Sequence, residues 1–299
     1  MAYKIAVASG KGGTGKTTVS VNLFLHLNER LGGKIKLVDC DVEEPNDIIF
    51  FNSSIKTDEI TITQLIPKID ANKCTFCRKC SEYCEFNAIV VIPPVKFAEV
   101  NSSLCHSCGA CSVACENNAI SEHPNKIGTV NRYTTQKGYE IIEGRLKIGS
   151  AMQTMLIKEL KKEVSPINDI VIFDAPPGTS CLVVETISDA NYIILVAEPT
   201  LFGLYDLKLM VNLVEELGIE FGLIINKSGI GDNSIYEYIE KENLELLGEI
   251  PFSKEYASIY ANGTITEIIP DTIRNSYNKV LNSLDQKINQ YEGNNYFKW

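Results

Sequence analysis

Along most of the chain, short apolar runs alternate with longer stretches in which apolar residues recur every three or four positions. Five of the runs are apolar at successive positions, apart from Lys36, and lie at residues 5–8, 35–38, 170–173, 192–196 and 222–225. Continuous apolar sequence suits strands that are buried on both faces, as in a parallel sheet covered by helices. We therefore predict that these runs form the strands of a buried sheet.

The stretches between these runs carry helical signals. In residues 17–31 valine or leucine recurs at every fourth position, and Gly32 and Gly33 follow as a stop signal. Residues 204–217 carry a similar apolar stripe, which Gly218 ends. Strands that alternate with helices predict the α/β class, with a doubly wound and mostly parallel sheet.

Residues 67–126 break this rhythm, because they are rich in cysteine and lack long helical periodicity. The segment also repeats itself: the residues from Cys74 match those from Cys105 at 9 of 16 positions, an offset of 31 (105 − 74). We therefore predict a small α+β domain at 67–126, inserted into a larger domain made of 1–66 and 127–290. Residues 291–299 are expected to form a C-terminal tail.

Composition narrows the classes of function. The formal net charge of −10 and the lack of a basic run argue against nucleic-acid binding, because an acidic surface repels phosphates. No apolar run approaches the roughly 18 residues of a membrane helix, so stable membrane insertion is not expected. Met1 leads at once into the first apolar run, which we interpret as a strand rather than a cleavable leader. We therefore expect a cytoplasmic protein.

A glycine-rich segment lies between the first apolar run and the first predicted helix. It fits the phosphate-loop pattern GxxxxGK[ST], in which backbone N–H groups and the helix N-terminus cradle phosphates. Lys16 is expected to reach the β- and γ-phosphates, and the Thr17 hydroxyl to bind Mg²⁺. The predicted nucleotide-binding residues of this loop are Gly10, Lys11, Gly12, Gly13, Thr14, Gly15, Lys16, Thr17 and Thr18.

Aspartates follow two of the predicted strands. Asp39 and Asp41 come after the second run, and Asp174 comes after the third. Ligands of open α/β sheets bind at the carboxyl ends of the strands, so all three are candidate catalytic residues. We expect Asp39 to hold Mg²⁺ together with Thr17, mostly through water, and a carboxylate near the γ-phosphate to orient the attacking water.

Eight of the ten cysteines lie between positions 74 and 115, and in the reducing cytosol such clustering favours metal ligation over disulfides. Each copy of the repeat has the C-x2-C-x2-C-x3-C spacing of bacterial ferredoxins, in which the fourth cysteine serves the other cluster of a pair. The predicted ligands are Cys74, Cys77, Cys80 and Cys115 for the first 4Fe–4S cluster, and Cys105, Cys108, Cys111 and Cys84 for the second.

The repeat also departs from the usual ferredoxin sequence. Glu85 and Glu116 stand where proline normally follows the fourth cysteine. Zinc is the competing metal, although structural zinc sites prefer two cysteine pairs with a longer spacer. His106 and His123 lie nearby, but eight cysteines complete the ligation, so we interpret both as exposed polar residues.

Lys11 is a second lysine within the loop, five residues before Lys16. This Lys-Gly-Gly-x-Gly-Lys-Thr-Thr form resembles the deviant Walker A group, which includes MinD-like, ParA-like, arsenical-pump and nitrogenase iron-protein ATPases. The resemblance implies ATP hydrolysis to ADP and phosphate by a homodimer with nucleotide near its interface. In that setting Lys11 is a catalytic residue that reaches the partner's nucleotide and stabilises charge, as an arginine finger does.

Other segments resemble the same group. The segment from Asp39 to Pro45 resembles its first switch, and Asp174-Ala-Pro-Pro-Gly178 resembles its second, so Gly178 is also expected at the nucleotide. The preference for ATP is implied by the resemblance alone, through four further residues. The residues that correspond to the group's adenine-binding positions are Asn226, Lys227, Pro251 and Phe252.

Cys40 and Cys181 lie outside the repeat. Most free cysteines are small core residues, and this is the first interpretation for both. Cys181 also lies close to the position at which the nitrogenase iron protein carries a ligand for a cluster shared between subunits. A bridging cluster is therefore the alternative for Cys181, although its second ligand has no obvious counterpart.

Together the motifs resemble MinD-superfamily, MinD/Mrp-like P-loop ATPases with an inserted ferredoxin domain, over residues 3–275. The first hypothesis is an ATP-dependent redox protein that passes electrons from two 4Fe–4S clusters to a partner protein. The second is a carrier or assembly factor that gives clusters to an accepting protein. The third is a positioning ATPase with structural clusters, although the polar tail lacks the basic amphipathic helix that anchors MinD to membranes.

Overall fold

The protein is described here from a computed structural model that covers residues 2–33, 35–164 and 170–296. Within these residues a nine-stranded sheet forms the centre, in the order β11-β10-β9-β1-β8-β2-β7-β6-β3. The neighbours from β11 to β7 pair in parallel, whereas β7–β6 and β6–β3 pair antiparallel. The predicted α/β class and mostly parallel sheet are thus confirmed.

Each of the five apolar runs lies inside one of the parallel strands. These strands are β1 (Tyr3–Ala8), β2 (Ile35–Asp39), β8 (Ile170–Asp174), β9 (Tyr192–Ala197) and β10 (Phe221–Ser228). Two further parallel strands, β7 (Glu140–Leu146) and β11 (Leu246–Pro251), were not among the predicted runs. A glycine interrupts the apolar sequence of both strands, so neither forms the run of successive apolar residues that was used to predict strands.

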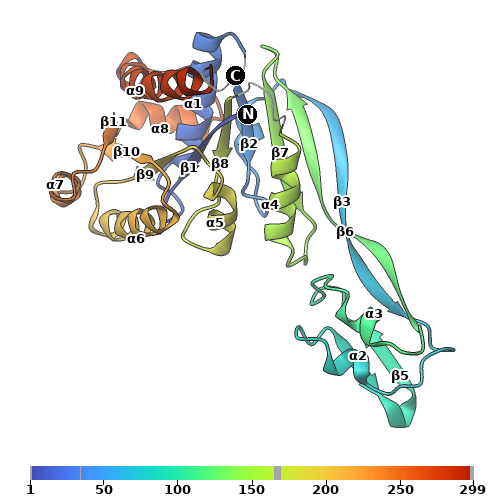
Figure 1. Ribbon diagram of the computed structural model, residues 1–299. Coiled ribbons are helices and arrows are strands. Elements are labelled where there is room, and N and C mark those ends of the chain that lie inside the picture. Colours follow the sequence, from blue (N-terminus) through green and yellow to red (C-terminus); the bar gives the residue numbers. More distant parts are fainter. Residues whose placement is uncertain (1, 34, 165–169, 297–299) are drawn as a thin grey trace.

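Helices cover both faces of the sheet (Figure 1). One face packs against α4 (Gln153–Lys162), α5 (Cys181–Ile187), α6 (Leu201–Leu217) and α7 (Ser234–Lys241). The other face packs against α1 (Lys16–Leu31), α8 (Lys254–Ala261) and α9 (Asp271–Tyr296). The sheet is therefore the shared middle layer of two hydrophobic cores.

The ends of the two predicted helices follow from their capping residues. Gly32 and Gly218 adopt left-handed backbone conformations after α1 and α6, and so end the helices where the sequence predicted. Helix α6 begins three residues earlier than predicted, at Leu201. The side chain of Thr200 accepts a hydrogen bond from the N–H of Gly203, which caps a first turn whose apolar residues are exposed.

An antiparallel ribbon projects from the sheet edge (Figure 1). Strands β3 (Ile55–Ile69) and β6 (Ile120–Thr134) pair along their whole length, but β6 pairs with β7 only from Gly128 onward. The outer half of the ribbon therefore has no third strand beside it among the described residues. It carries α2 (Lys79–Glu82), β4 (Ile89–Ile92), η2 (Pro93–Val95), β5 (Phe97–Val100) and α3 (Ala110–Ala114).

The domain limits expected from the sequence do not fall between secondary-structure elements. The limits at 66/67 and 126/127 fall inside β3 and β6, so the ribbon belongs to both units. The expected tail at 291–299 differs from the structure, because α9 continues to Tyr296; residues 297–299 lie outside the described part. An apolar stripe explains the long helix: Ile273, Tyr277 and Leu284 are all buried against the sheet. Among the described residues no helix has the length and apolar character needed to cross a membrane.

We predict that α9 is essential to the core rather than an appendage. Leu284 is 1% exposed, so Leu284→Ala should lower the free energy of unfolding by about 2–5 kcal/mol. Leu209→Ala is the control, because Leu209 is 41% exposed and should change stability by less than about 1 kcal/mol. Equal losses for the two variants in chemical denaturation would show that the helix contributes little.

Candidate functional site

The glycine loop joins β1 to α1 at the carboxyl end of the strand. Gly13 and Gly15 have φ values of 79° and 89°, a left-handed region that residues with a Cβ rarely adopt. A Cβ at Gly15 would lie 2.1 Å from Nδ2 of Asn226, so the close contact also requires glycine there. These two glycines let the loop curl over the first turn of α1, as a phosphate cradle requires.

Asp174 is the hub of hydrogen bonds beneath this loop. Its carboxylate pairs with Nζ of Lys16 at 2.8 Å and accepts hydrogen bonds from Thr17 Oγ1 at 2.9 Å and Ser20 Oγ at 2.6 Å. Burial alone would lower the pKa of Lys16, but the attraction and hydrogen bond of Asp174 outweigh it and raise the pKa. Lys16, Thr17 and Asp174, chosen separately from the sequence, therefore form one connected group.

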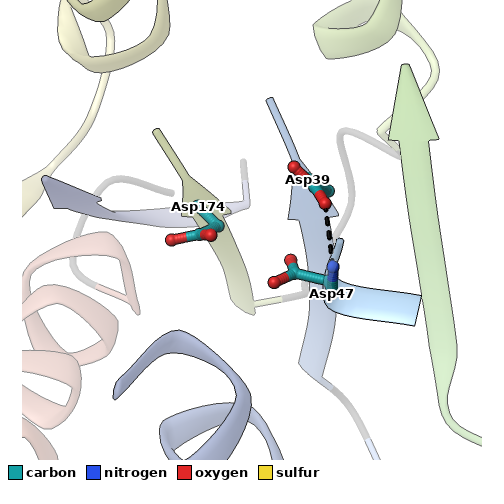
Figure 2. A group of neighbouring side chains, drawn as sticks. All are labelled: Asp39, Asp47 and Asp174. Carbon is teal, nitrogen blue, oxygen red and sulfur yellow. Dashed lines mark hydrogen bonds between the residues drawn. The ribbon is translucent and has the colours of Figure 1, made fainter. Parts of the chain in front are cut away.

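Asp174 also converges with two further carboxylates, those of Asp39 and Asp47, as Figure 2 shows. Asp39 ends β2, Asp174 ends β8, and Asp47 begins η1 (Asp47–Phe50); one oxygen from each lies within 4.8 Å of the others. All three residues are at most 1% exposed. Asp39 accepts hydrogen bonds from the backbone N–H of Asp41, Asn46 and Asp47.

Asp47 is a site residue that the sequence interpretation missed. Neither of its carboxylate oxygens has a hydrogen-bond donor within the described part of the chain. Burial first, then the charges of Asp39 and Asp174, raise the pKa of Asp47 well above its usual range. The available signal was its place between the Asp39 segment and an apolar run, which is too weak to identify a site residue by itself.

The same causes act on the other aspartates of this loop. Burial and the charge of Asp174 raise the pKa of Asp39 to about 7, and burial also raises the pKa of Asp41. The Asp41 side chain does not belong to the converging trio. Asp39 and Asp174 are thus brought together as the sequence suggested, whereas Asp41 stands beside them.

The donor set suits a divalent cation. Mg²⁺ takes hard oxygen ligands, and here a threonine hydroxyl and three carboxylates supply only oxygens. The unpartnered oxygens of Asp47 also indicate that a positive group is needed near them. Thr17, Asp39, Asp47 and Asp174 could therefore hold Mg²⁺, directly or through water, while Lys16 neutralises phosphate.

Glu198 organises the lysines at the mouth of the loop, a role that sequence interpretation also missed. It pairs with Lys11 at 2.5 Å and with Lys227 at 3.1 Å, and both pairings lower its pKa although burial opposes them. Lys227 Nζ also donates to the carbonyl of Gly13 at 2.8 Å, and Asn226 Nδ2 donates to that of Thr14 at 2.7 Å.

The residues expected around adenine thus divide into two sets. Asn226 and Lys227 brace the glycine loop, as described above, whereas Pro251 ends β11 and Phe252 is exposed beside it. Gly178 has a φ of 94° and donates its N–H to the carbonyl of Ser9, which ties the second switch segment to the loop. The carbonyl of Thr18 accepts from Asn22 within α1. Contact of any of these residues with a base remains a prediction.

The eight repeat cysteines line two separate hollows. We call the hollow that contacts Ile69 the first cysteine cavity and the one that contacts Pro67 the second cysteine cavity. The first is lined by Cys74, Cys77, Cys80 and Cys115. The second is lined by Cys84, Cys105, Cys108 and Cys111. These are the two sets of four that the crossed spacing predicted.

The backbone around the two cavities repeats in detail. Backbone N–H groups donate to the sulfurs of Cys74 and Cys84, and also to those of Cys105 and Cys115, the residues 31 positions later (74 + 31 and 84 + 31). Left-handed backbone also recurs at this offset. The matched residues are Phe76 and Ser107, Arg78 and Gly109, and Asn87 and Asn118.

These features fit iron–sulfur clusters better than zinc. Hydrogen bonds to cysteine sulfur stabilise and tune bound clusters, and four cysteines line each cavity. Three cysteines of each set come from one tight loop and the fourth from the other copy. Two cysteine pairs with a longer spacer, which structural zinc prefers, are not the arrangement here.

The remaining cysteines and histidines occupy different surroundings. Cys40 is buried, and burial raises its pKa well above the usual range, so it is a core residue. Cys181 is exposed at the start of α5, so the core interpretation is wrong for it. His123 contacts the hydroxyl of Ser121, and His106, though exposed, stacks on Phe86 beside the second cysteine cavity.

We predict that the buried carboxylate of Asp47 lowers the stability of the folded protein. Its raised pKa means that the folded state loses stability as the pH rises above the pKa of an unfolded aspartate. Asp47→Asn should therefore raise the free energy of unfolding at pH 8 by roughly 1–3 kcal/mol, as measured by chemical denaturation. This gain in stability should be smaller at pH 5.

The same substitution should raise the Mg²⁺ concentration needed for tight ADP binding in calorimetry. Exposed Asp58, replaced by asparagine, is the control for both measurements. A variant that is destabilised at pH 8 and keeps the parent's Mg²⁺ dependence would contradict the role assigned to Asp47.

Comparison with known proteins places this site in a family. The family model described as the CobQ/CobB/MinD/ParA nucleotide binding domain matches residues 5–266. The uncharacterized protein MJ0579 of Methanocaldococcus jannaschii is 32% identical over 264 residues, which cover 87% of this chain and 89% of the relative. An iron-sulfur cluster carrier protein of Pyrococcus abyssi is 23% identical over 308 residues, covering 97% and 88%.

The fold is also found among solved structures. The septum site-determining protein MinD of Pyrococcus horikoshii, solved with Mg-ADP, superposes with a TM-score of 0.59 at 19% identity, covering 96% of this chain and 98% of MinD. The family match spans most of the chain, and its glycine loop and strand-end aspartates lie together at one site. The chain therefore belongs to the CobQ/CobB/MinD/ParA nucleotide-binding family, as a MinD/Mrp-like P-loop protein.

Proposed function

We propose that this protein hydrolyses ATP and couples the nucleotide state of a homodimer to electron transfer from two 4Fe–4S clusters to a partner protein. One observation carries the proposal: the loop between Asp39 and Asp47, two of the site's three converging carboxylates, leads through η1 to the ribbon that bears the cysteine cavities. Such a protein needs a reducing compartment, which is consistent with the cytoplasm.

The link between site and ribbon is a short chain of contacts. Asp39 accepts hydrogen bonds at 2.7 and 3.0 Å from the N–H groups of Asn46 and Asp47, which fix the start of η1. Strand β3 begins at Ile55, five residues after η1 ends at Phe50. The same loop also receives a hydrogen bond from the N–H of Leu146 to the carbonyl of Val42.

This second contact reaches the other strand of the ribbon. Leu146 pairs with Gly128, the position at which β6 leaves the sheet. Both strands of the ribbon are thus attached to residues 40–50, so a displacement of this loop would move the ribbon base from two sides. Entry of a nucleotide and Mg²⁺ beside Asp39 is the event that would cause it.

Hydrolysis would use the residues already assembled at the glycine loop. A phosphate would draw Lys16 from Asp174, which frees the carboxylate for Mg²⁺ or its waters. Bound Mg²⁺ supplies positive charge to the phosphates. Asp39 or Asp41 would orient the attacking water, and Asn226, Lys227, Pro251 and Phe252 would border the base.

The proposed homodimer has support from the surface next to Lys11. Leu201, Phe202 and Tyr205 at the start of α6 are 69%, 79% and 63% exposed, a cluster of apolar side chains that a second subunit could cover. Glu198 lies just before them and holds Lys11 in the present arrangement. Lys11 would exchange Glu198 for the nucleotide of the partner subunit.

A cluster carrier is the second candidate, favoured by the likeness to the carrier protein of Pyrococcus abyssi. In this chain, however, each cavity has a full set of four cysteines within one subunit, which suits resident clusters more than cargo. A positioning ATPase with structural clusters is the third candidate, and it gives no reason for two such sites.

The proposal is tested by reducing the purified protein and mixing it with candidate acceptor proteins, with and without MgATP. Faster oxidation of the clusters with MgATP supports electron transfer, and iron transfer to an apo-acceptor supports the carrier. If MgATP produces neither result, the positioning function is the candidate that remains. Protein that remains free of iron after anaerobic reconstitution would reject all redox forms of the proposal.

We predict that the two sites are chemically separable. Lys16→Ala should weaken ATP binding at least tenfold, about 1.4 kcal/mol, while the iron content per chain stays at the parent's value. Exposed Lys158, replaced by alanine, is the matched control. Calorimetry and iron analysis provide the measurements, and a joint loss of ATP binding and iron would contradict separability.

We predict a different result for the second lysine. Lys11→Ala should still bind ATP within about tenfold of the parent but lose most of its hydrolysis, because the charge it provides acts only in the transition state. Phosphate release measured at several protein concentrations gives the test. Parental turnover by this variant would remove Lys11 from catalysis.

A further inference from the structure

The two cysteine cavities share one backbone but differ in the side chains around them. At the offset of 31 residues, Thr75 corresponds to His106, and Phe86 corresponds to Asn117 (75 + 31 and 86 + 31). Each cavity is lined by one member of each pair. Because the frame is the same, such substitutions are a direct source of difference between clusters bound in the two cavities.

In the first cysteine cavity this pair of positions is polar. Asn117 Nδ2 donates to the Thr75 hydroxyl at 3.0 Å, and both side chains line the cavity. Polar side chains beside a cluster stabilise negative charge on it.

In the second cysteine cavity the same positions are aromatic. The rings of Phe86 and His106 stack with centroids 3.9 Å apart and planes 15° from parallel. The stacked pair lines the second cavity at the positions where the first cavity has an amide and a hydroxyl. Phe86 has no hydrogen-bond donor where Asn117 has an amide, so the second cavity has fewer donors on this side.

Charged residues add to the same contrast. Arg78 and Lys79 line the first cavity, whereas the corresponding residues of the second are Gly109 and Ala110. Lys79 pairs with Glu116 at 2.5 Å, but Glu116 does not line the cavity. The second cavity is lined instead by the carboxylate-bearing Glu122, which corresponds to Val91 in the first (91 + 31).

Each of these differences between the two cavities favours reduction of a cluster in the first cavity over reduction of one in the second. A 4Fe–4S cluster gains one electron on reduction and so becomes more negative, which donors and cations favour and a carboxylate opposes. We propose that the first cysteine cavity holds the cluster of higher potential, set by Thr75, Asn117, Arg78 and Lys79. An electron that enters the second cluster from an external low-potential donor then passes to the first, which is reduced as the second is reoxidised.

This inference rests on the proposed pair of clusters, and the experiment separates the two claims. Iron, sulfide and Mössbauer analysis of the full-length protein first establish whether two 4Fe–4S clusters are present. If they are absent, the proposed function fails and this inference fails with it. If they are present, a dithionite titration followed by electron paramagnetic resonance should resolve two one-electron steps. We expect at least a tenfold preference for the first site, or about 59 mV.

Exchange of the matched residues assigns the steps. Thr75→His with Asn117→Phe should lower the higher potential, and His106→Thr with Phe86→Asn should raise the lower one. Arg78→Gly with Lys79→Ala gives a second test of the first cavity in case the aromatic exchange loses a cluster. Glycine suits position 78 because Arg78 has a φ of 71°. Thr57→His, on the ribbon outside both cavities, is the control.

Two results would overturn the inference while leaving the proposed function intact. One is a single shared potential for both clusters in the parent protein. The other is a variant of the first cavity that shifts only the lower-potential step, because the order of the two sites would then be reversed. Spectroscopic potentials report both outcomes without any measurement of ATPase activity.

Discussion

The nucleotide site depends on one buried ion pair, between Lys16 and Asp174, set among more negative charge than the lysine can neutralise. Three buried carboxylates lie within 4.8 Å of one another, and Lys16 pairs with one of them, Asp174. Burial makes such an excess of charge costly, which is why the pKa of Asp47 rises well above its usual range. A site of this kind is completed by a cation and a phosphate, and the glycine loop provides the cradle for both.

The loop from Asp39 to η1 is the structural bridge between this charge cluster and the rest of the molecule. The carboxylate of Asp39 holds both of its ends, through the N–H groups of Asp41, Asn46 and Asp47, and η1 then leads toward β3. A paired ribbon of two long strands transmits displacement better than a single segment would, because each strand holds the other in register. The ribbon in Figure 1 thus connects two kinds of chemistry that the sequence places in separate motifs.

The cysteine-bearing end shows how a duplicated sequence can keep its frame and change its surroundings. The N–H to sulfur hydrogen bonds and left-handed positions recur at a fixed offset, because they are needed to turn the chain around four sulfurs. The flanking side chains are free to differ. One cavity has a hydrogen-bonded amide and hydroxyl where the other has a stacked phenylalanine and histidine, and this difference adds to the unequal charges around the two cavities.

Sequence by itself determined the features that depend on local pattern: buried strands from apolar runs, helix ends from glycines, the phosphate loop, and the two sets of four cysteines. Tertiary structure alone decided what lies far apart along the chain, including the approach of Asp47 to Asp174, the pairing of Glu198 with Lys11, and the ribbon that spans both units. A motif records the spacing of residues within one segment. Contacts between segments arise from packing in three dimensions, where strand order and burial bring together residues that no short pattern connects.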